Sequence, residues 1–453
     1  MDEVRPRHTL LSAVWDLLRS RGAYVVAALP LLALACSQGT SEPTAPPPEF
    51  LPTPAGTDLP AASQPAPDPT EPPNSPEASA EPSPTPAIEV SPPPTLVTPS
   101  GPPPKLDVSI ASVPLEEVLF DTFDGGSIQL SKASDRDIDG LRDRIRPIYE
   151  PRYDDVTGGD WLDDDDRVIG YVSGSGTAFA YPLKILNSHE IVNDVIDGVY
   201  VLVTYSPLCG SGLVNDRMLD GQLLVFGNTS ALYQSDMVMF DHQTGSYWFQ
   251  VASEAVVGPL TGKRMKLLPS MTTTWAQWKE LHPETRVLSI DLGFYPISLI
   301  GNPYARDPFA GYEQSLNRGR FAFRVSEERL DPRLQSGDIV LAVEIGDSHK
   351  AYPLTDRPDE VLSDVVAGEE VVVVVRSEGP SGTAFFSEVD GQTLTFSLAD
   401  GLLRDAETGS TWDDGGRATS GPMAGEQLTP VPSRTAFWFA LTVSLPDLEL
   451  YVP

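Results

Sequence analysis

Short runs of β-branched and other apolar residues recur along the chain beyond residue 160, separated by Gly, Asp and Ser. Clear examples are Val168–Val172, Val199–Val203 and Val371–Val375. Runs of this length between turn-forming residues are typical of β-strands. Asp220-Gly221 and Asp390-Gly391 lie between apolar stretches, so both pairs predict hairpin turns.

Helical patterns are fewer and shorter than the strand patterns. The best candidates run from Leu183 to Asn193 and from Thr274 to Leu281, and the second of these ends before Pro283. Strand-rich sequence with a few short helices predicts a mainly β or α+β fold built from antiparallel strands.

The first 36 residues have the pattern of an export signal. Four arginines precede an uncharged apolar run from Ala23 to Ala35, which stops at Cys36. This run is shorter than the roughly 20 residues that a membrane-spanning helix needs. A cysteine at this place resembles a lipobox, so we predict that residues 1–36 form a lipoprotein signal peptide and that Cys36 is lipidated. A plain secretory signal or an uncleaved anchor is the alternative.

Residues 37–104 consist largely of Pro, Ser, Thr, Ala and Glu and contain no Lys or Arg. This composition predicts a disordered, extended linker. Together with the anchor at Cys36, it predicts a body tethered to the extracytoplasmic face of a membrane in the cell envelope.

Charge and cysteine content exclude some classes of function. The chain has 31 basic and 64 acidic residues and a formal net charge of −33. Such a balance argues against a nucleic-acid partner, which requires basic surface. If Cys36 is lipidated, Cys209 is the sole remaining thiol, which excludes an intramolecular disulfide.

Several strings of the first half of the body recur in the second half, in the same order. The matching pairs are Ala180–Leu183 with Ala351–Leu354, Gly221–Phe226 with Gly391–Phe396, and Thr244–Trp248 with Thr408–Trp412. Their offset changes only from 171 at Ala180 to 163 at Trp275, which falls opposite Trp438. We interpret this as an internal duplication.

The duplication sets the domain boundaries. Residues 161–295 and 330–453 are the two predicted homologous units, with a lead-in at 105–160 and a connecting segment at 296–329. The string Thr-Gly-Ser-x-Trp occurs in both units, which favours a structural hairpin whose Trp fills the core over a sugar-stacking platform.

The stretches 180–194 and 204–210 closely resemble the DUF3179 family of uncharacterised proteins. Further motifs fit the family pattern in order, namely Asp160–Asp166, Asp241–Trp248, Gly258–Gly262, Trp275–Trp278 and Asp307–Tyr312. The resemblance covers nearly all of residues 135–453. It implies a domain whose function is itself unassigned.

One departure from the family pattern matters for chemistry. Where the family resemblance implies Tyr-Cys-Pro-Leu-Cys, this chain has Ser206 in place of the first Cys. The loop therefore cannot carry dithiol redox chemistry, which needs two thiols. If the family uses that pair to hold a metal or cofactor, this member has replaced one ligand by a hydroxyl or has lost the function.

The best candidate site lies in the first unit. His189, Glu190, Asn193 and Asp194 fall within about a turn and a half if their stretch is helical, with His189 and Asn193 on one face. Cys209 follows in a Pro-Leu-Cys-Gly loop. A histidine and a thiolate can bind a soft or borderline metal, or form a nucleophile pair.

Three hypotheses follow. In the first, the unit binds a metal such as copper, zinc or iron through His189, Cys209 and His242, or a small ligand. The predicted ligand-binding residues are Glu190, Asn193 and Asp241. In the second, an envelope enzyme uses Cys209, or His189 with Asp194, as catalytic residues. In the third, the body is a structural envelope-interaction module.

Two candidates also have plain structural alternatives. A lone Cys such as Cys209 often serves as a small buried apolar residue, and His189 can simply tie a helix to a loop. At the matching places the second unit has Asp359 for His189 and no Cys; it keeps only the acidic group, at Asp364. This asymmetry favours binding or chemistry in the first unit.

Overall fold

The computed structural model describes residues 98–99, 101–445 and 447–452. The predicted signal peptide, Cys36 and residues 37–97 of the predicted linker lie outside these ranges. The described body is rich in strands and has few, short helices, which confirms the mainly β class. Among the described residues no helix has the length and apolar composition to cross a membrane.

The strands form antiparallel sheets with occasional parallel pairs. One sheet has the order β14 (Glu254–Val257), β13 (Tyr247–Phe249), β12 (Asp236–Asp241), β11 (Phe226–Tyr233), β1 (Leu119–Asp121) and β2 (Ser127–Gln129). A second has the order β16 (Met271–Thr274), β4 (Arg167–Val172), β5 (Ala178–Pro182), β17 (Arg286–Leu288) and β3 (Tyr153–Asp154). Smaller sheets are β20 (Glu360–Val366), β21 (Glu369–Arg376) and β22 (Ser381–Phe386), and β25 (Phe396–Ala399), β26 (Leu402–Asp405), β27 (Thr411–Trp412) and β28 (Ala418–Ser420).

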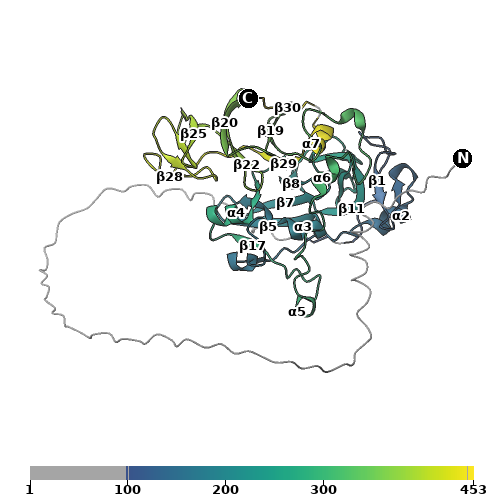
Figure 1. Ribbon diagram of the computed structural model, residues 1–453. Coiled ribbons are helices and arrows are strands. Elements are labelled where there is room, and N and C mark those ends of the chain that lie inside the picture. Colours follow the sequence, from purple (N-terminus) through teal and green to yellow (C-terminus); the bar gives the residue numbers. More distant parts are fainter. Residues whose placement is uncertain (1–97, 100, 446, 453) are drawn as a thin grey trace, which may run out of the picture. The chain divides into compact units, whose positions relative to one another are not determined.

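The largest sheet combines strands from both predicted units. Its order is β30 (Glu449–Leu450), β19 (Ser348–Pro353), β18 (Ile339–Ile345), β29 (Ser433–Phe437), β8 (Ser211–Asp216), β7 (Val199–Ser206) and β6 (Ile191–Ile196), with β15 (Lys266–Leu267) paired to β8. The two halves join where Thr435 of β29 pairs with Gly212 of β8, in the middle of the body in Figure 1. Phe437 N also donates to Cys209 O at 2.8 Å. The two predicted units therefore share one sheet.

Short helices connect or cover the strands. They are α2 (Asp135–Leu141), α3 (Leu183–His189), α4 (Trp275–Leu281), α5 (Ile297–Ile300), α6 (Tyr312–Leu316) and α7 (Trp438–Ser444), with 3₁₀ turns η1 (Leu130–Lys132), η2 (Val156–Gly159) and η3 (Glu327–Arg329). The predicted helix ending at Leu281 is confirmed, because Thr274 caps α4 in a capping box with Gln277.

The helix predicted from Leu183 to Asn193 is wrong in its second half. It ends at His189, because Glu190 takes a left-handed backbone conformation with φ of 57°. The β-branched run that follows pairs with β7 as strand β6. His189 and Asn193 consequently do not share a helix face, since one ends a helix and the other lies in a strand.

Both predicted hairpin turns are present. Asp220-Gly221 joins β9 (Met218–Leu219) to β10 (Gln222–Leu223), and Asp390-Gly391 joins β23 (Glu388–Val389) to β24 (Gln392–Thr393). The Asp and Gly of each pair have positive φ, as the favoured two-residue hairpin turns require.

Two hydrogen-bond patterns occur at matching positions of both predicted units. The Trp248 indole donates to Asp241 at 3.0 Å, and the Trp412 indole donates to Asp405 at 2.9 Å. Both indoles are buried, as a hairpin whose Trp fills the core requires. In the same way the Tyr181 hydroxyl donates to Asp194, and Tyr352 donates to Asp364. These correspondences support the duplication, which stays a prediction.

Candidate functional site

A cavity opens beside the point where α3 passes into β6. It is a small cavity with a volume of about 40 Å³. We call it the Glu190 cavity; its lining includes Glu190, Ser206, Asn228, Met237, Phe309 and Phe323. Nine of the fourteen lining side chains are apolar, and the polar ones converge from β1, the turn after α3, the end of β7 and β11. A mainly apolar pocket with a few convergent polar groups is typical of small-ligand sites.

Glu190 is the central polar group of this cavity. Its left-handed backbone turns the chain out of α3, and its Oε2 accepts a hydrogen bond from Asn228 Nδ2 at 2.6 Å. Burial raises the pKa of the Glu190 carboxyl to about 8, the nearby Asp236 adds to the rise, and the hydrogen bond from Asn228 opposes it. At neutral pH the carboxyl is therefore mostly protonated and can donate a hydrogen bond.

Ser206 lines the cavity from the end of β7, at the position where the family resemblance implies a cysteine. Cys209 lies three residues further on, is fully buried, and directs its thiol at Ser235 O at 3.5 Å. Burial raises the pKa of the Cys209 thiol well above its usual value, and the carboxyl of Asp236 raises it further. The thiol is therefore neutral, whereas a nucleophile or a metal ligand needs a thiolate.

We expect Cys209 to react with Ellman's reagent at least about a hundredfold more slowly than a free thiol, because it is buried and protonated. The measurement uses a Cys36→Ser chain, which leaves Cys209 as the sole thiol. Unfolding in guanidinium is expected to restore the normal rate. Fast modification of the folded chain would contradict the buried, neutral thiol.

His189 lies outside the cavity and has both ring nitrogens engaged. Nδ1 contacts the carbonyl oxygen of Arg146 at 2.7 Å, so this nitrogen carries the proton. Nε2 then accepts from the Tyr304 hydroxyl at 2.7 Å, and the ring stacks on Phe294. Burial lowers the pKa of His189 to about 4. This geometry is that of the alternative in which His189 ties a helix to a loop.

Asn193 and Asp194 point to places other than the cavity. Asn193 clamps the backbone of Phe226, donating to its oxygen at 2.9 Å and accepting from its nitrogen at 2.8 Å. Asp194 accepts from the hydroxyls of Tyr153 and Tyr181, and burial raises its pKa. Both side chains therefore hold strands together in this structure.

Asp241 and His242 lie on the far end of β12 from the cavity. Asp241 holds Trp248 and the turn that follows β12. His242 Nε2 lies 3.0 Å from the Tyr149 hydroxyl, which donates to Asp143 at 3.1 Å. Burial lowers the pKa of His242 to about 4.

The predicted metal ligands His189, Cys209 and His242 thus lie in separate hydrogen-bonding environments. Within the part of the chain that the structure describes, no group of three or more His, Cys, Asp or Glu is arranged to hold a metal ion. The described residues therefore include no set of ligands for copper, zinc or iron.

The sequence model of a family described as a protein of unknown function, DUF3179, matches residues 142–447, about two thirds of the chain. The chain belongs to the DUF3179 family. No curated protein and no solved structure matches it. The DUF3179 match contains Glu190, Ser206 and Asn228, whereas Asp121, which also lines the cavity, precedes the matched range.

Several groups at the site of this DUF3179 chain could not be predicted from its sequence. Asn228 and Asp236 carried no motif signal, because their role depends on contacts with Glu190 across the fold. Phe309 could have been found, since it belongs to the motif at 307–312 that fits the DUF3179 pattern.

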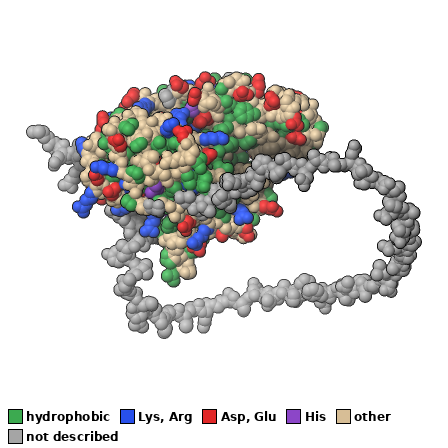
Figure 2. Space-filling view, turned by 180° about the vertical axis from the view of Figure 1, so that it is seen from behind, with side chains coloured by type: hydrophobic (Ala, Val, Ile, Leu, Met, Phe, Trp, Pro, Cys, Tyr) green, Lys and Arg blue, Asp and Glu red, His purple; other side chains and the backbone are tan. Residues whose placement is uncertain are grey.

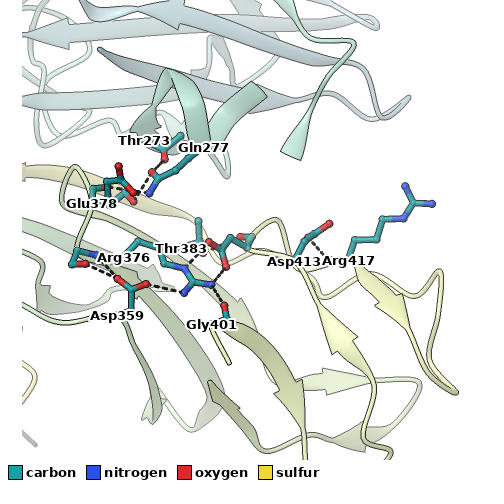
Figure 3. A network of polar contacts seen from close by, with 12 residues as sticks. Thr273, Gln277, Asp359, Arg376, Glu378, Thr383, Gly401, Asp413 and Arg417 are labelled. Carbon is teal, nitrogen blue, oxygen red and sulfur yellow. Dashed lines mark hydrogen bonds and ion pairs between the residues drawn. The ribbon is translucent and has the colours of Figure 1, made fainter. Parts of the chain in front are cut away.

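The second half of the DUF3179 region has a groove at the matching place. Arg376 ends β21 as Ser206 ends β7, and the groove that it lines also contacts α4 through Gln277. The Arg376 guanidinium donates to Asp414 at 2.5 and 2.7 Å and to Asp359 at 3.2 Å (Figure 3). In the second predicted unit, charged side chains in ion pairs therefore stand where the first unit has the Ser206 hydroxyl and the neutral Glu190 carboxyl.

Proposed function

We propose that this DUF3179 protein binds a small, uncharged and largely apolar molecule in the Glu190 cavity. The observation that carries the proposal is a partly buried Glu190 carboxyl, with a pKa of about 8, on the wall of a cavity. The setting, on the outer face of a membrane with Cys36 as the lipid anchor, belongs to the same proposal.

The side chains that line the Glu190 cavity determine which class of ligand fits it. Phe309, Phe323 and Met237 offer apolar and aromatic contact surface, which favours an apolar ring or chain. A protonated Glu190 donates a hydrogen bond and so suits a carbonyl or ether oxygen. An anionic ligand would lose its hydration on entering, and the acidic residues of the lining, Glu190 and Asp121, offer no positive charge to offset the loss.

The other hypotheses have less support. An enzyme using Cys209 lacks a thiolate, and His189 and Asp194 serve separate hydrogen-bond networks. A purely structural module has no need of a buried acid on a cavity wall, because such a group costs folding free energy.

The test uses benzamide as a neutral probe and benzoate as its charged counterpart, with binding followed by saturation-transfer NMR on the full chain. We expect benzamide to bind at pH 7 with about millimolar affinity, and benzoate to bind more weakly. Glu190→Ala is expected to weaken benzamide binding by about tenfold.

Glu360→Ala is the matched control, because Glu360 occupies the corresponding position of the second predicted unit and pairs with Arg357. It is expected to leave benzamide binding unchanged. The proposal fails if neither probe binds, or if both Ala variants bind benzamide as the unmodified chain does.

A further inference from the structure

One loop of the body exposes an unusual amount of apolar surface. Residues 292–305 contain no charged side chain, and α5 forms their tip. Leu299 is 83% exposed, the most of any large hydrophobic side chain among the described residues, and Ile300 and Tyr295 are 53% and 42% exposed. In Figure 1 α5 projects away from the sheets, and in Figure 2 the same lower tip is green. We call residues 292–305 the apolar loop.

The base of the apolar loop is fixed to the core. Phe294 stacks on His189 at a ring separation of 4.6 Å, and Tyr304 bonds to the same histidine. The two residues stand on either side of the tip, so His189 holds both ends of the loop. Gly293 and Gly301, which bracket the tip, have φ of 77° and 74°, where other residues are strained. The exposed tip is therefore presented by a rigid base.

An exposed apolar tip on a rigid base indicates an interaction surface. A tyrosine beside aliphatic side chains, with no charge over fourteen residues, is the composition that proteins place at the boundary of a bilayer. The rest of the chain is acidic, with a net charge of −33, so attraction to anionic lipids does not assist. Uncharged lipid surface is the partner that this chemistry fits.

The predicted anchor brings that surface within reach. Between Cys36 and the first described residue lie 61 residues, whose contour length of at most about 220 Å lets the body contact the bilayer. Tethering also raises the local concentration of lipid around the body. A loop that inserts only weakly is therefore enough to hold the body on the bilayer. We propose that residues 295–300 insert into the interfacial layer of the membrane to which Cys36 is anchored. The proposal rests on the predicted lipidation and is independent of the ligand in the Glu190 cavity.

The experiment uses the full chain, with acylation of Cys36 verified by mass spectrometry, reconstituted in phosphatidylcholine vesicles. Leu299→Cys carries an environment-sensitive dye, and the buried Cys209 does not compete for it. We expect blue-shifted emission and quenching by iodide that is weaker by about threefold or more than for the same dye in water. Ile300→Cys serves as a second labelled position.

Leu402→Cys is the matched control, because Leu402 is 52% exposed but belongs to β26 of the second predicted unit. Its dye is expected to remain accessible to iodide. Equal quenching at positions 299 and 402 overturns the proposal, as does a Cys36 without acyl groups. A blue shift that needs no vesicles and grows with protein concentration overturns it in favour of a second copy of this chain.

Discussion

Raising the pH from 5 to 9 is expected to lower the free energy of unfolding by about 4 kcal/mol through Glu190 alone. The pKa of Glu190 is about 8 in the folded protein, against a usual value of 4.5. Between these values the folded state keeps a proton that the unfolded chain has released. The stabilisation is fully present below pH 4.5 and is lost as the pH rises through 8.

The measurement is denaturant unfolding at pH 5, 7 and 9 of the unmodified chain and of Glu190→Gln, which cannot ionise. The raised pKa of Asp236, about 6, also lowers the free energy of unfolding as the pH rises. This effect is largely complete above pH 6, where that of Glu190 continues. The lowered pKa values of His189 and His242, about 4, raise the free energy of unfolding as the pH rises toward 6.5. These three groups are present in both proteins, so the difference between the two curves isolates Glu190. Parallel curves would show that Glu190 is ionised at neutral pH.

The sequence correctly predicted those turns and helix ends whose formation depends only on neighbouring residues. Asp220-Gly221 forms its hairpin because both residues accept positive φ. Thr274 starts α4 because its hydroxyl and Gln277 satisfy the free backbone groups. The end of α3 was missed, because only the left-handed turn at Glu190 and the pairing of β6 with β7 decide between helix and strand there.

At the candidate site, too, the sequence predicted local features but not those that depend on contacts between distant residues. Sequence motifs located the neighbourhood, since Glu190 and Ser206 both line the cavity. They did not assign roles, because the partner of His189 is Tyr304, 115 residues away, and that of Glu190 is Asn228. Contacts over such distances depend on how the sheets pack, which no single segment encodes.

The shared sheet implies that the two predicted units unfold together. Arg434 of β29 is 2% exposed, donates to Val251 O in the first unit at 2.5 Å, and pairs with Glu344 in the second. Separating the units would break the hydrogen bond from Arg434 to Val251 O, whereas the ion pair with Glu344 lies within the second unit. The Thr435–Gly212 pairing would also be lost.

We therefore expect Trp248→Ala and Trp412→Ala each to lower the free energy of unfolding of the whole body by about 3–5 kcal/mol, in a single transition. Each change removes a buried indole and one of the hydrogen-bond donors to a buried carboxyl, Asp241 or Asp405. Guanidinium unfolding followed by far-UV and near-UV circular dichroism measures both quantities.

Trp161→Phe is the control for this comparison, because Trp161 is only partly buried and the change keeps an aromatic ring. It is expected to cost less than about 1.5 kcal/mol. Two separated transitions in Trp412→Ala, with the first unit unfolding at its original midpoint, would mean that the β8–β29 junction does not couple the units. A single shifted transition means that damage in the second unit reaches the Glu190 cavity through the shared sheet, so the second unit then acts as a scaffold for the first.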